Sequence, residues 1–191
     1  MPLAAYTIEH LEPATWSAFA DLVERNDGIY GGCWCVAFHA EYQRGVSDPR
    51  TLKEDLVRRG RAHAAIVCDD EGRAQGWCQY GRCSELELRW QREYRKDPPA
   101  PPEWRIACIF VDKRHRGLGI ARAALGGALA QIATAGGGLV EAISEATAGR
   151  EAQGRFLFSA TAELFEDVGF SRVRQVGKHA WIVHKVVEAA R

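Results

Sequence analysis

The sequence has no long hydrophobic run and no excess of either charge. No stretch approaches the roughly 18 apolar residues that a membrane-spanning helix needs, and the first residues lack a basic segment followed by an apolar run. Lysine plus arginine equals aspartate plus glutamate at 25 each, so no global field would attract nucleic acid or an anionic membrane. These absences predict a cytoplasmic protein that binds neither nucleic acid nor membranes. Any anion site must be local.

Cysteine is sparse, and its spacing suits neither a disulfide framework nor a metal site. The six cysteines lie mostly in apolar segments, which predicts reduced thiols in a reducing compartment. Cys33 and Cys35 could chelate zinc as a pair. A tetrahedral zinc site needs further ligands, however, and no second paired cysteine or histidine motif supplies them. We therefore predict small, partly buried free thiols and no bound metal.

The length and apolar content fit one domain. With 191 residues, 47% of them hydrophobic, the chain can bury a sizeable core, whereas two full domains would be cramped. The highly charged stretch 82–103 ends in Asp-Pro-Pro-Ala-Pro-Pro at 97–102, whose prolines exclude helix and central strand. We predict a single domain, 1–191, with 82–103 as a surface excursion within it.

Hydrophobic periodicity and turn residues predict elements in the order βααβββαβαββ. The predicted strands are residues 6–11, 63–68, 75–81, 106–111, 139–144, 170–176 and 180–187. The predicted helices are one that begins at residue 13 and those at 49–61, 117–135 and 159–168. The strand at 106–111 shows no polar alternation, so it should lie in the middle of a sheet.

The strand at 106–111 runs directly into a basic, glycine-bearing turn that opens a helix. Residues 114–119 read Arg-His-Arg-Gly-Leu-Gly. Backbone N–H groups at a helix N-terminus have no intrahelical partner and sit at the positive end of the helix dipole, so they can hold an anion. The two glycines let a ligand approach the backbone closely. This pattern predicts a phosphate cradle; a loop that merely tightens the turn is the alternative.

A second motif follows at residues 164–170, which read Leu-Phe-Glu-Asp-Val-Gly-Phe. With the strand before the cradle and the helix after it, the two motifs resemble those of the GNAT superfamily, the acetyl-CoA-dependent N-acyltransferases, over nearly the whole chain. The resemblance implies one α+β domain with a mixed, mostly antiparallel sheet flanked by helices. A dinucleotide-binding Rossmann protein is a weaker alternative, because Arg122 stands where the third glycine of that fingerprint belongs.

The resemblance implies acetyl-CoA as cosubstrate and places its binding site. In this superfamily the strand before the cradle diverges from the next strand, and the acyl-pantetheine arm lies in the gap like an added strand. By resemblance, main-chain groups of Ile109, Phe110 and Val111 bind the arm, and one of these N–H groups polarises the thioester oxygen. The pyrophosphate would bind to Arg114, His115, Arg116, Gly117, Leu118, Gly119, Ile120 and Ala121.

Two departures from the family pattern concern proton transfer. Many members carry a tyrosine four residues before the glycine of the second motif, where it protonates the CoA thiolate. This chain has Phe165, which cannot transfer a proton and is either an apolar wall against the arm or part of the core. The usual base positions on the strand before the cradle hold Arg105 and Ala107, and neither can act as a conventional base.

Glu141 is the candidate catalytic base. It is a carboxylate inside an otherwise apolar strand, where burial is unfavourable without a task or a partner. A structural salt bridge with an arginine explains the residue equally well. If Glu141 is the base, Glu141→Gln should lose most turnover and retain acetyl-CoA affinity.

Candidate acceptor-side residues are aromatic. Trp34 lies in the glycine-rich loop 26–35, and its alternative role is a hydrophobic plug that pins this loop. Trp77 and Tyr80 lie on the predicted strand 75–81, and core packing is the alternative for Tyr80. The Gly-Cys-Trp-Cys sequence at 32–35 resembles an element of a bacterial subgroup of the superfamily. His39 and His63 are expected to be surface or capping residues.

The predicted function is transfer of an acetyl group from acetyl-CoA to a primary amine of a small molecule or peptide by direct attack. A CoA-binding regulatory or scaffold module is the alternative, because of the missing tyrosine and strand base. The acceptor stays open, since its pocket could be acidic, for a polyamine or aminoglycoside, or apolar, for an aryl amine. Edge strands near the C-terminus would allow a homodimer.

Overall fold

Strand β4, Trp104–Val111, lies at the centre of a seven-stranded sheet in a computed structural model that describes residues 6–42, 46–88, 91–149 and 157–191. The strand order is β1-β2-β3-β4-β5-β7-β6. Pairing is antiparallel except between β4 and β5, which run parallel. β4 is buried along most of its length, which explains its lack of polar alternation. The predicted mixed, mostly antiparallel sheet is confirmed.

The order of strands and helices also agrees with the sequence, with one exception. The remaining strands are β1 Thr7–His10, β2 His63–Cys68, β3 Ala74–Arg82, β5 Gly138–Glu145, β6 Ser171–Gln175 and β7 Ala180–Val187. The helices are α1 Trp16–Glu24, α2 Pro49–Arg58, α3 Gln91–Lys96, α4 Ile120–Thr134 and α5 Ala162–Glu166. The short helix α3 was not predicted, because the prolines at 98–102 lie beyond it and only prevent its continuation.

The excursion at 82–103 is more than a surface loop. Leu86 and Tyr94 are buried, and the backbone of Leu86 forms a β-bridge with His39. The segment therefore packs against the loop that joins α1 and α2.

None of the helices in the described ranges has the length and the apolar character that a membrane span requires.

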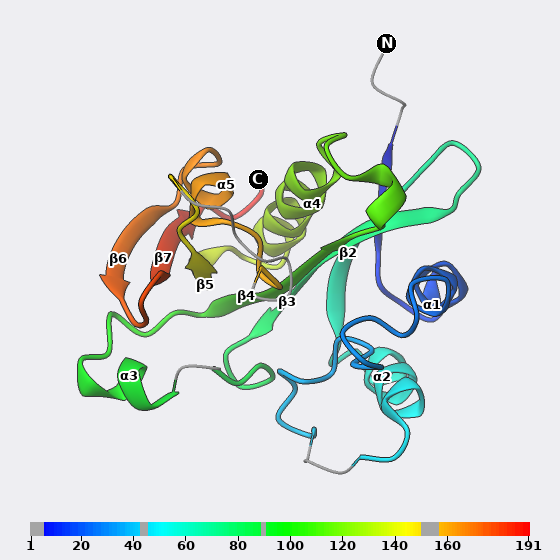
Figure 1. Cartoon of the computed structure of the whole chain (residues 1–191), viewed down its shortest axis with the longest axis horizontal. Helices are drawn as coiled ribbons and strands as arrows, with labels where there is room; N and C mark the ends of the chain where they lie inside the picture. Colours follow the sequence, from blue (N-terminus) through cyan, green and yellow to red (C-terminus); the bar gives the residue numbers. More distant parts are fainter. Residues whose placement is uncertain (1–5, 43–45, 89–90, 150–156) are drawn as a thin grey trace.

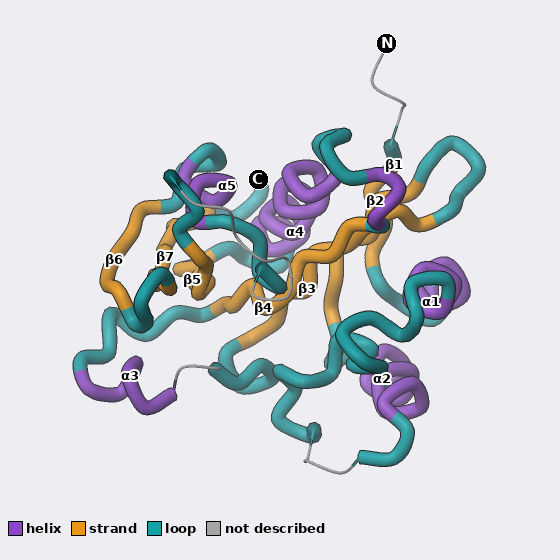
Figure 2. Tube along the Cα trace, viewed as in Figure 1, coloured by secondary structure: helices purple, strands orange, loops and turns teal. Residues whose placement is uncertain are grey.

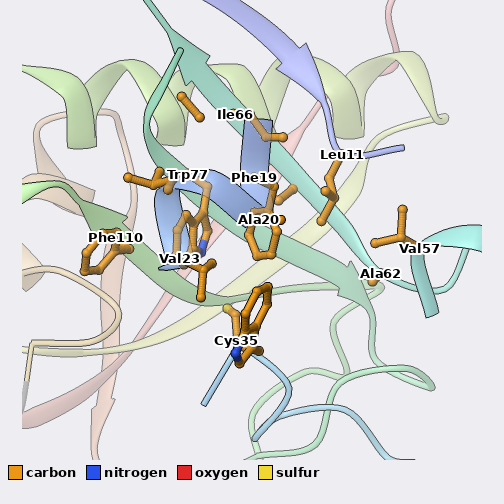
Figure 3. Packing of buried hydrophobic residues seen from close by; sticks show 14 of the residues in the cluster. Leu11, Phe19, Ala20, Val23, Cys35, Val57, Ala62, Ile66, Trp77 and Phe110 are labelled. Atoms are coloured by element: carbon orange, nitrogen blue, oxygen red, sulfur yellow. The ribbon is translucent and has the colours of Figure 1, made fainter. Parts of the chain in front are cut away.

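Helices cover both faces of the sheet (Figure 1). α4 and α5 pack on one face, where a cluster includes Ile120, Leu125 and Phe165. α1 and α2 pack on the other, where Phe19 and Phe110 each lie 4.8 Å from Trp77 between ring centroids. Figure 3 labels Trp77, Phe110 and Cys35 in this second cluster. In Figure 2 the loop between α1 and α2 runs from α1 toward the middle of the molecule on this side.

β4 and β5 part after a short stretch of pairing. Their register covers Trp104↔Val140, Arg105↔Glu141 and Ile106↔Ala142 only. An irregularity between Gln79 and Tyr80 on the β3 side falls at the same level of β4. Beyond it, the N–H of Ile109 donates to the carbonyl oxygen of Phe158 at 2.7 Å. The expected gap between the strands is therefore present, and the segment that contains Phe158 supplies a partner at its edge.

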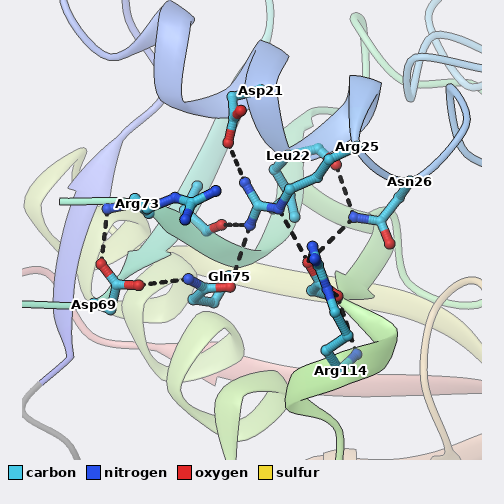
Figure 4. A network of polar contacts seen from close by, with 10 residues as sticks. Asp21, Leu22, Arg25, Asn26, Asp69, Arg73, Gln75 and Arg114 are labelled. Atoms are coloured by element: carbon cyan, nitrogen blue, oxygen red, sulfur yellow. Dashed lines mark hydrogen bonds and ion pairs between the residues drawn. The ribbon is translucent and has the colours of Figure 1, made fainter. Parts of the chain in front are cut away.

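A buried carboxylate, Asp112, ties the end of β4 to the residues that follow α1 and to the turn that follows β4; its partners Arg25, Asn26 and Arg114 are labelled in Figure 4. Asp112 accepts hydrogen bonds from Arg25 Nε at 3.0 Å, from Arg114 Nη2 at 2.8 Å and from the Arg114 N–H at 3.0 Å. The Arg114 hydrogen bonds hold the pKa of Asp112 well below its usual range, and Arg25 and Asn26 add to this. The Asp112 side chain is fully buried, so this carboxylate fixes where the turn begins.

We predict that Asp112→Asn destabilises the protein in a pH-dependent way. Because the folded-state pKa is depressed, the stabilisation is fully present above the unfolded-state pKa of about 4 and is lost as pH falls below it. Urea denaturation should show a loss of about 3 kcal/mol at neutral pH that shrinks in acid. Asp21→Asn, which removes a half-exposed partner of Arg25, should cost less than about 1 kcal/mol. A loss for Asp112→Asn that does not change with pH would contradict the assignment.

Candidate active site

The turn after β4 has the backbone geometry of an anion cradle. A short 3-10 helix, Lys113–His115, is capped by Asp112, and α4 then begins at Ile120. Gly117 and Gly119 both have φ of +80°, and an added Cβ at either position would meet nothing within 4 Å. The two glycines are required by the left-handed backbone rather than by crowding. The space in front of them is open to a ligand.

A cavity of about 430 Å³ lies over this turn, and we call it the donor cavity. It is lined by Tyr30, Ile109, Phe110, Val111, His115, Arg116, Gly117, Gly119, Ile120, Ala121, Arg122, Leu157, Ala160 and Leu164. The described lining includes three side chains that carry or can gain a positive charge, His115, Arg116 and Arg122, and it contains no carboxylate. The Nδ1 atom of His115 is shielded from solvent and has no hydrogen-bond partner among the described residues. The residues that line the cavity therefore fit a polyanionic ligand.

Three of the predicted cosubstrate residues do not line the donor cavity. The Arg114 guanidinium is bound to Asp112, so Arg116 is the cradle arginine that faces the cavity. Leu118 is an exposed residue of the turn. Phe165 is fully buried and packs edge-on against Phe170, 5.0 Å between centroids, which makes it core; its neighbour Leu164 lines the cavity instead.

A second cavity of about 420 Å³ lies on the α1 and α2 side of the sheet, and we call it the acceptor cavity. It is lined by Ile29, Tyr30, Gly31, Gly32, Cys33, Cys35, Ala37, Phe38, Tyr42, Val46, Pro49, Trp77, Cys108 and Phe158. Tyr30 lines both cavities. Of the three aromatic residues expected on the acceptor side, Trp77 lines this cavity. Cys35 and Cys108 line it too, although the sequence did not single them out for it.

Trp34 and Tyr80 lie elsewhere. Trp34 is buried, stacks on Trp16 at 6.1 Å between centroids and lies under the guanidinium of Arg50, so it pins the loop as the alternative interpretation supposed. Tyr80 is buried in the cluster on the opposite face of the sheet, 6.0 Å from Trp104. Successive side chains of a strand point to opposite faces, so Tyr80, three residues after Trp77, lies on the face away from Trp77.

The loop that carries Trp34 is conformationally strained. Ile29, Tyr30, Trp34 and Cys35 all have positive φ, between +45° and +58°. A left-handed backbone is a genuine outlier for a β-branched or bulky residue, and such residues persist only where surrounding structure holds them. Here the buried side chains of Ile29, Trp34 and Cys35 supply that constraint.

Beneath the acceptor cavity lies a buried polar cluster. Gln79 contacts both the Cys35 thiol, through Oε1, and His39 Nε2, through Nε2 at 2.9 Å. Lys53 Nζ lies 3.3 Å from His39 Nε2 and donates to the carbonyl oxygen of Cys35 at 3.3 Å. Lys53 is fully buried, and His39 is 2% exposed, so the expectation that His39 is a surface or capping residue was wrong.

The cluster contains the buried amine of Lys53, and no carboxylate of the described residues lies beside it. Burial lowers the pKa of Lys53, and nearby cysteines partly offset this effect. Burial together with the Lys53 charge also lowers the pKa of His39, which keeps the imidazole neutral. A sequence signal for this cluster exists: Lys53, Leu56 and Val57 have helical spacing on the apolar face of α2, where a lysine is out of place.

Glu141 is fully buried on β5 and has three partners. Its Oε1 accepts from Arg105 Nε at 3.2 Å. Its Oε2 accepts from the Tyr94 hydroxyl at 2.8 Å and lies 2.9 Å from His184 Nε2. These contacts favour the alternative interpretation, a structural anion for Arg105. The role of general base stays a prediction, although Glu141 does line a small cavity of about 30 Å³ beside Ala107 and Phe158.

Comparison with known sequences gives one family. A sequence profile described as "Acetyltransferase (GNAT) family" matches residues 34–157. This range includes β4, the cradle, β5 and the residues around the buried polar cluster. No curated protein sequence matches the chain significantly.

Solved structures share the fold at low sequence identity. A GNAT-family acetyltransferase from Desulfovibrio desulfuricans is 16% identical, with a TM-score of 0.57 over 96% of this chain and 99% of that one. The GNAT N-acetyltransferase YhbS from Escherichia coli, crystallised in complex with CoA, is 16% identical, with a TM-score of 0.53 over 98% and 84%. A mosquito arylalkylamine N-acetyltransferase-like protein is 8% identical, with a TM-score of 0.57 over 95% and 100%.

We predict that Glu141→Gln lowers the free energy of unfolding by about 3 kcal/mol, because Arg105 would lose its buried counter-charge. Glu188→Gln, an exposed change just beyond the end of β7, should change stability by less than about 0.5 kcal/mol. Urea denaturation of the two variants and the parent chain measures both effects. Unchanged stability in Glu141→Gln would contradict the role of Glu141 as a structural counter-charge for Arg105 and would favour the role of general base.

Proposed function

The chain belongs to the GNAT family of acetyltransferases, and we propose that it transfers an acetyl group from acetyl-CoA to a primary amine by direct attack. The acceptor is a small molecule or peptide whose amine sits on an apolar or aromatic body. The observation that carries this proposal is the pair of cavities beside β4, one with basic side chains in its lining and one with aromatic side chains and no carboxylate among its described residues.

The donor cavity supports acetyl-CoA as cosubstrate. Backbone N–H groups at the start of α4, the Arg116 side chain and the unpaired His115 nitrogen would hold the pyrophosphate. The N–H groups of Ile109 and Val111 fall on the edge of β4 that faces the gap, since hydrogen-bonding direction alternates along a strand. CoA bound to the Escherichia coli relative is in keeping with this assignment.

The acceptor cavity supports an amine on an apolar body. The described residues that line it include five aromatic side chains and no aspartate or glutamate. A polyamine or an aminoglycoside carries several charges, which would be desolvated there without a counter-charge. Aromatic walls instead suit an aryl or alkyl group. We also propose that the Gly-Cys-Trp-Cys element, whose two cysteines line this cavity, marks a subgroup of the family with this kind of acceptor.

We predict that Gly119→Ala weakens acetyl-CoA binding by at least about tenfold, which corresponds to about 1.4 kcal/mol. Alanine is strained at a φ of +80°, and relief of the strain would turn the cradle N–H groups away. Calorimetric titration measures the affinity. Gly126→Ala is the matched control, because this exposed glycine lies inside α4 with no positive φ; it should stabilise the fold by about 1 kcal/mol and leave the affinity unchanged. Equal affinities for the two variants would contradict the cradle assignment.

We predict that phenylalkylamines have a kcat/KM at least about tenfold above that of spermidine, measured by release of free CoA thiol. The reason is the missing counter-charge in the acceptor cavity. Preference for the polyamine would contradict the proposed acceptor class. Acetyl-CoA binding without turnover of any amine in the panel would instead favour the alternative function, a CoA-binding module. Phe165, which replaces the tyrosine of many family members, is the reason for this alternative.

A further inference from the structure

We propose that Cys35 and Cys108 act together as the base and the acid of the acetyl transfer. Cys35, as a thiolate, takes a proton from the attacking amine, and Cys108, as a thiol, gives a proton to the departing CoA sulfur. The inference rests on the proposed function and supplies the two roles that Phe165, Arg105 and Ala107 leave vacant.

The two thiols lie where both reactants would meet. Cys35 and Cys108 are each 4% exposed, and both line the acceptor cavity. The two cysteines are far apart in the sequence but belong to one buried cluster, and each influences the pKa of the other. Cys108 directly precedes Ile109, whose N–H faces the gap between β4 and β5 and donates to the carbonyl oxygen of Phe158 at its edge. An acyl group held at that N–H would therefore lie beside the Cys108 thiol.

The surroundings of Cys35 favour its thiolate. Lys53 is buried without a carboxylate partner among the described residues, so a thiolate at Cys35 would supply its counter-charge. The indole N–H of Trp77 is fully buried, lines the cavity and makes no other hydrogen bond in the described part of the chain. A buried, unpaired N–H is unfavourable unless an acceptor faces it at some stage. A negatively charged sulfur at Cys35 meets that need.

The same surroundings separate the ionisation of the two thiols. Burial alone would raise the pKa of Cys35, but the Cys108 thiol, the Lys53 charge and the Trp77 N–H outweigh it and lower the pKa to about 7. The neighbouring Cys35, together with burial, raises the pKa of Cys108 well above its ordinary value. Two coupled groups whose pKa values are pushed apart are the usual form of an acid and base pair.

Gln79 accommodates both charge states of Cys35. In the thiol state Cys35 donates to Gln79 Oε1, while Gln79 Nε2 donates to His39 Nε2. When Cys35 ionises, a half-turn of the amide places its NH₂ group toward the sulfur.

The proton balance closes without a further reactant. The amine nitrogen forms a bond to the carbonyl carbon of the thioester, and the bond from that carbon to the CoA sulfur breaks. Cys35 takes one proton from the nitrogen, and Cys108 supplies one proton to the CoA sulfur. A proton then passes from Cys35 to Cys108 within the cavity that both line, so the pair is restored for the next turnover.

Alkylation of the wild-type chain tests the thiolate without any substitution. Iodoacetamide, followed by peptide mass spectrometry, should label Cys35 with a rate that rises through a midpoint near pH 7, as the fraction of thiolate rises. Lys53→Met removes the positive charge and should move this midpoint upward. The ionisable groups around Cys35 that enter the same profile are Tyr30 and Cys33 from the loop, His39, Lys53 from α2, Cys78 from β3 and Cys108 from β4. A Cys35 midpoint at or above that of an ordinary thiol would overturn the proposal.

Kinetics test the two roles. Cys35→Ser and Cys108→Ser should each lower kcat by about 10²-fold or more while the calorimetric affinity for acetyl-CoA stays within about twofold. The rise of kcat with pH through a midpoint near 7, which is the acidic limb of the profile, should disappear in Cys35→Ser. Cys68→Ser and Cys83→Ser, which lie outside both cavities, are the matched controls and should keep wild-type kcat. Wild-type kcat in either test variant would overturn the proposal, and thermal unfolding separates misfolded variants from inactive ones.

Incubation with acetyl-CoA alone separates this proposal from its nearest alternative. The base role predicts no covalent change in the intact mass, whereas an acetyl group found on Cys35, labile to hydroxylamine, would show a nucleophile and overturn it. Failure of acetyl-CoA to bind at all would overturn the proposed function itself. Binding and turnover that survive loss of both thiols would overturn the thiol pair alone.

Discussion

The divergence of β4 from β5 is the constraint on which both cavities depend. Parallel pairing stops after Ile106 and Ala142, so the backbone groups beyond that level must find other partners. The carbonyl oxygen of Phe158 accepts a hydrogen bond from the N–H of Ile109. The segment around Phe158 lies between the two cavities, because Leu157 and Ala160 line the donor cavity and Phe158 lines the acceptor cavity. A fully paired β4 would leave no strand edge at which a thioester and an amine could meet.

Two buried ionisable side chains on the α1 and α2 side of the sheet have opposite surroundings. Glu141 has Arg105, Tyr94 and His184 around it, so its charge is neutralised and its oxygen atoms are occupied. Lys53 has a carbonyl oxygen, a neutral imidazole and thiols, and none of these is a permanent anion. Burial of an uncompensated amine is unfavourable, and a stable fold tolerates it most readily where a function depends on it.

The sequence predicted what is local and missed what depends on distant partners. Strand and helix periods placed nearly every element, and the turn after β4 was recognisable because its glycines, its basic residues and the helix that follows are contiguous. Trp77 and Tyr80 are three residues apart on β3, so strand alternation alone places them on opposite faces, and only Trp77 could face the acceptor side. The partners of Glu141 lie on α3, β4 and β7, which are distant in the sequence. The sequence therefore could not distinguish a catalytic base from a structural anion at this position. Cys35 and Cys108 line one cavity because the strained loop that carries Cys35 packs into the same buried cluster as Cys108 of β4.

The hydrogen bond between Ile109 and Phe158 bears on how the donor would enter. An acyl arm bound along β4 as an added strand needs the same N–H, so the bond to Phe158 must be exchanged for one to the arm. Replacing one amide hydrogen bond by another leaves the number of satisfied groups unchanged, and the net difference is on the order of 1 kcal/mol or less. The greater consequence is the displacement of the chain around Phe158, whose side chain also lines the acceptor cavity. Entry of the donor would therefore reshape the wall against which the acceptor packs.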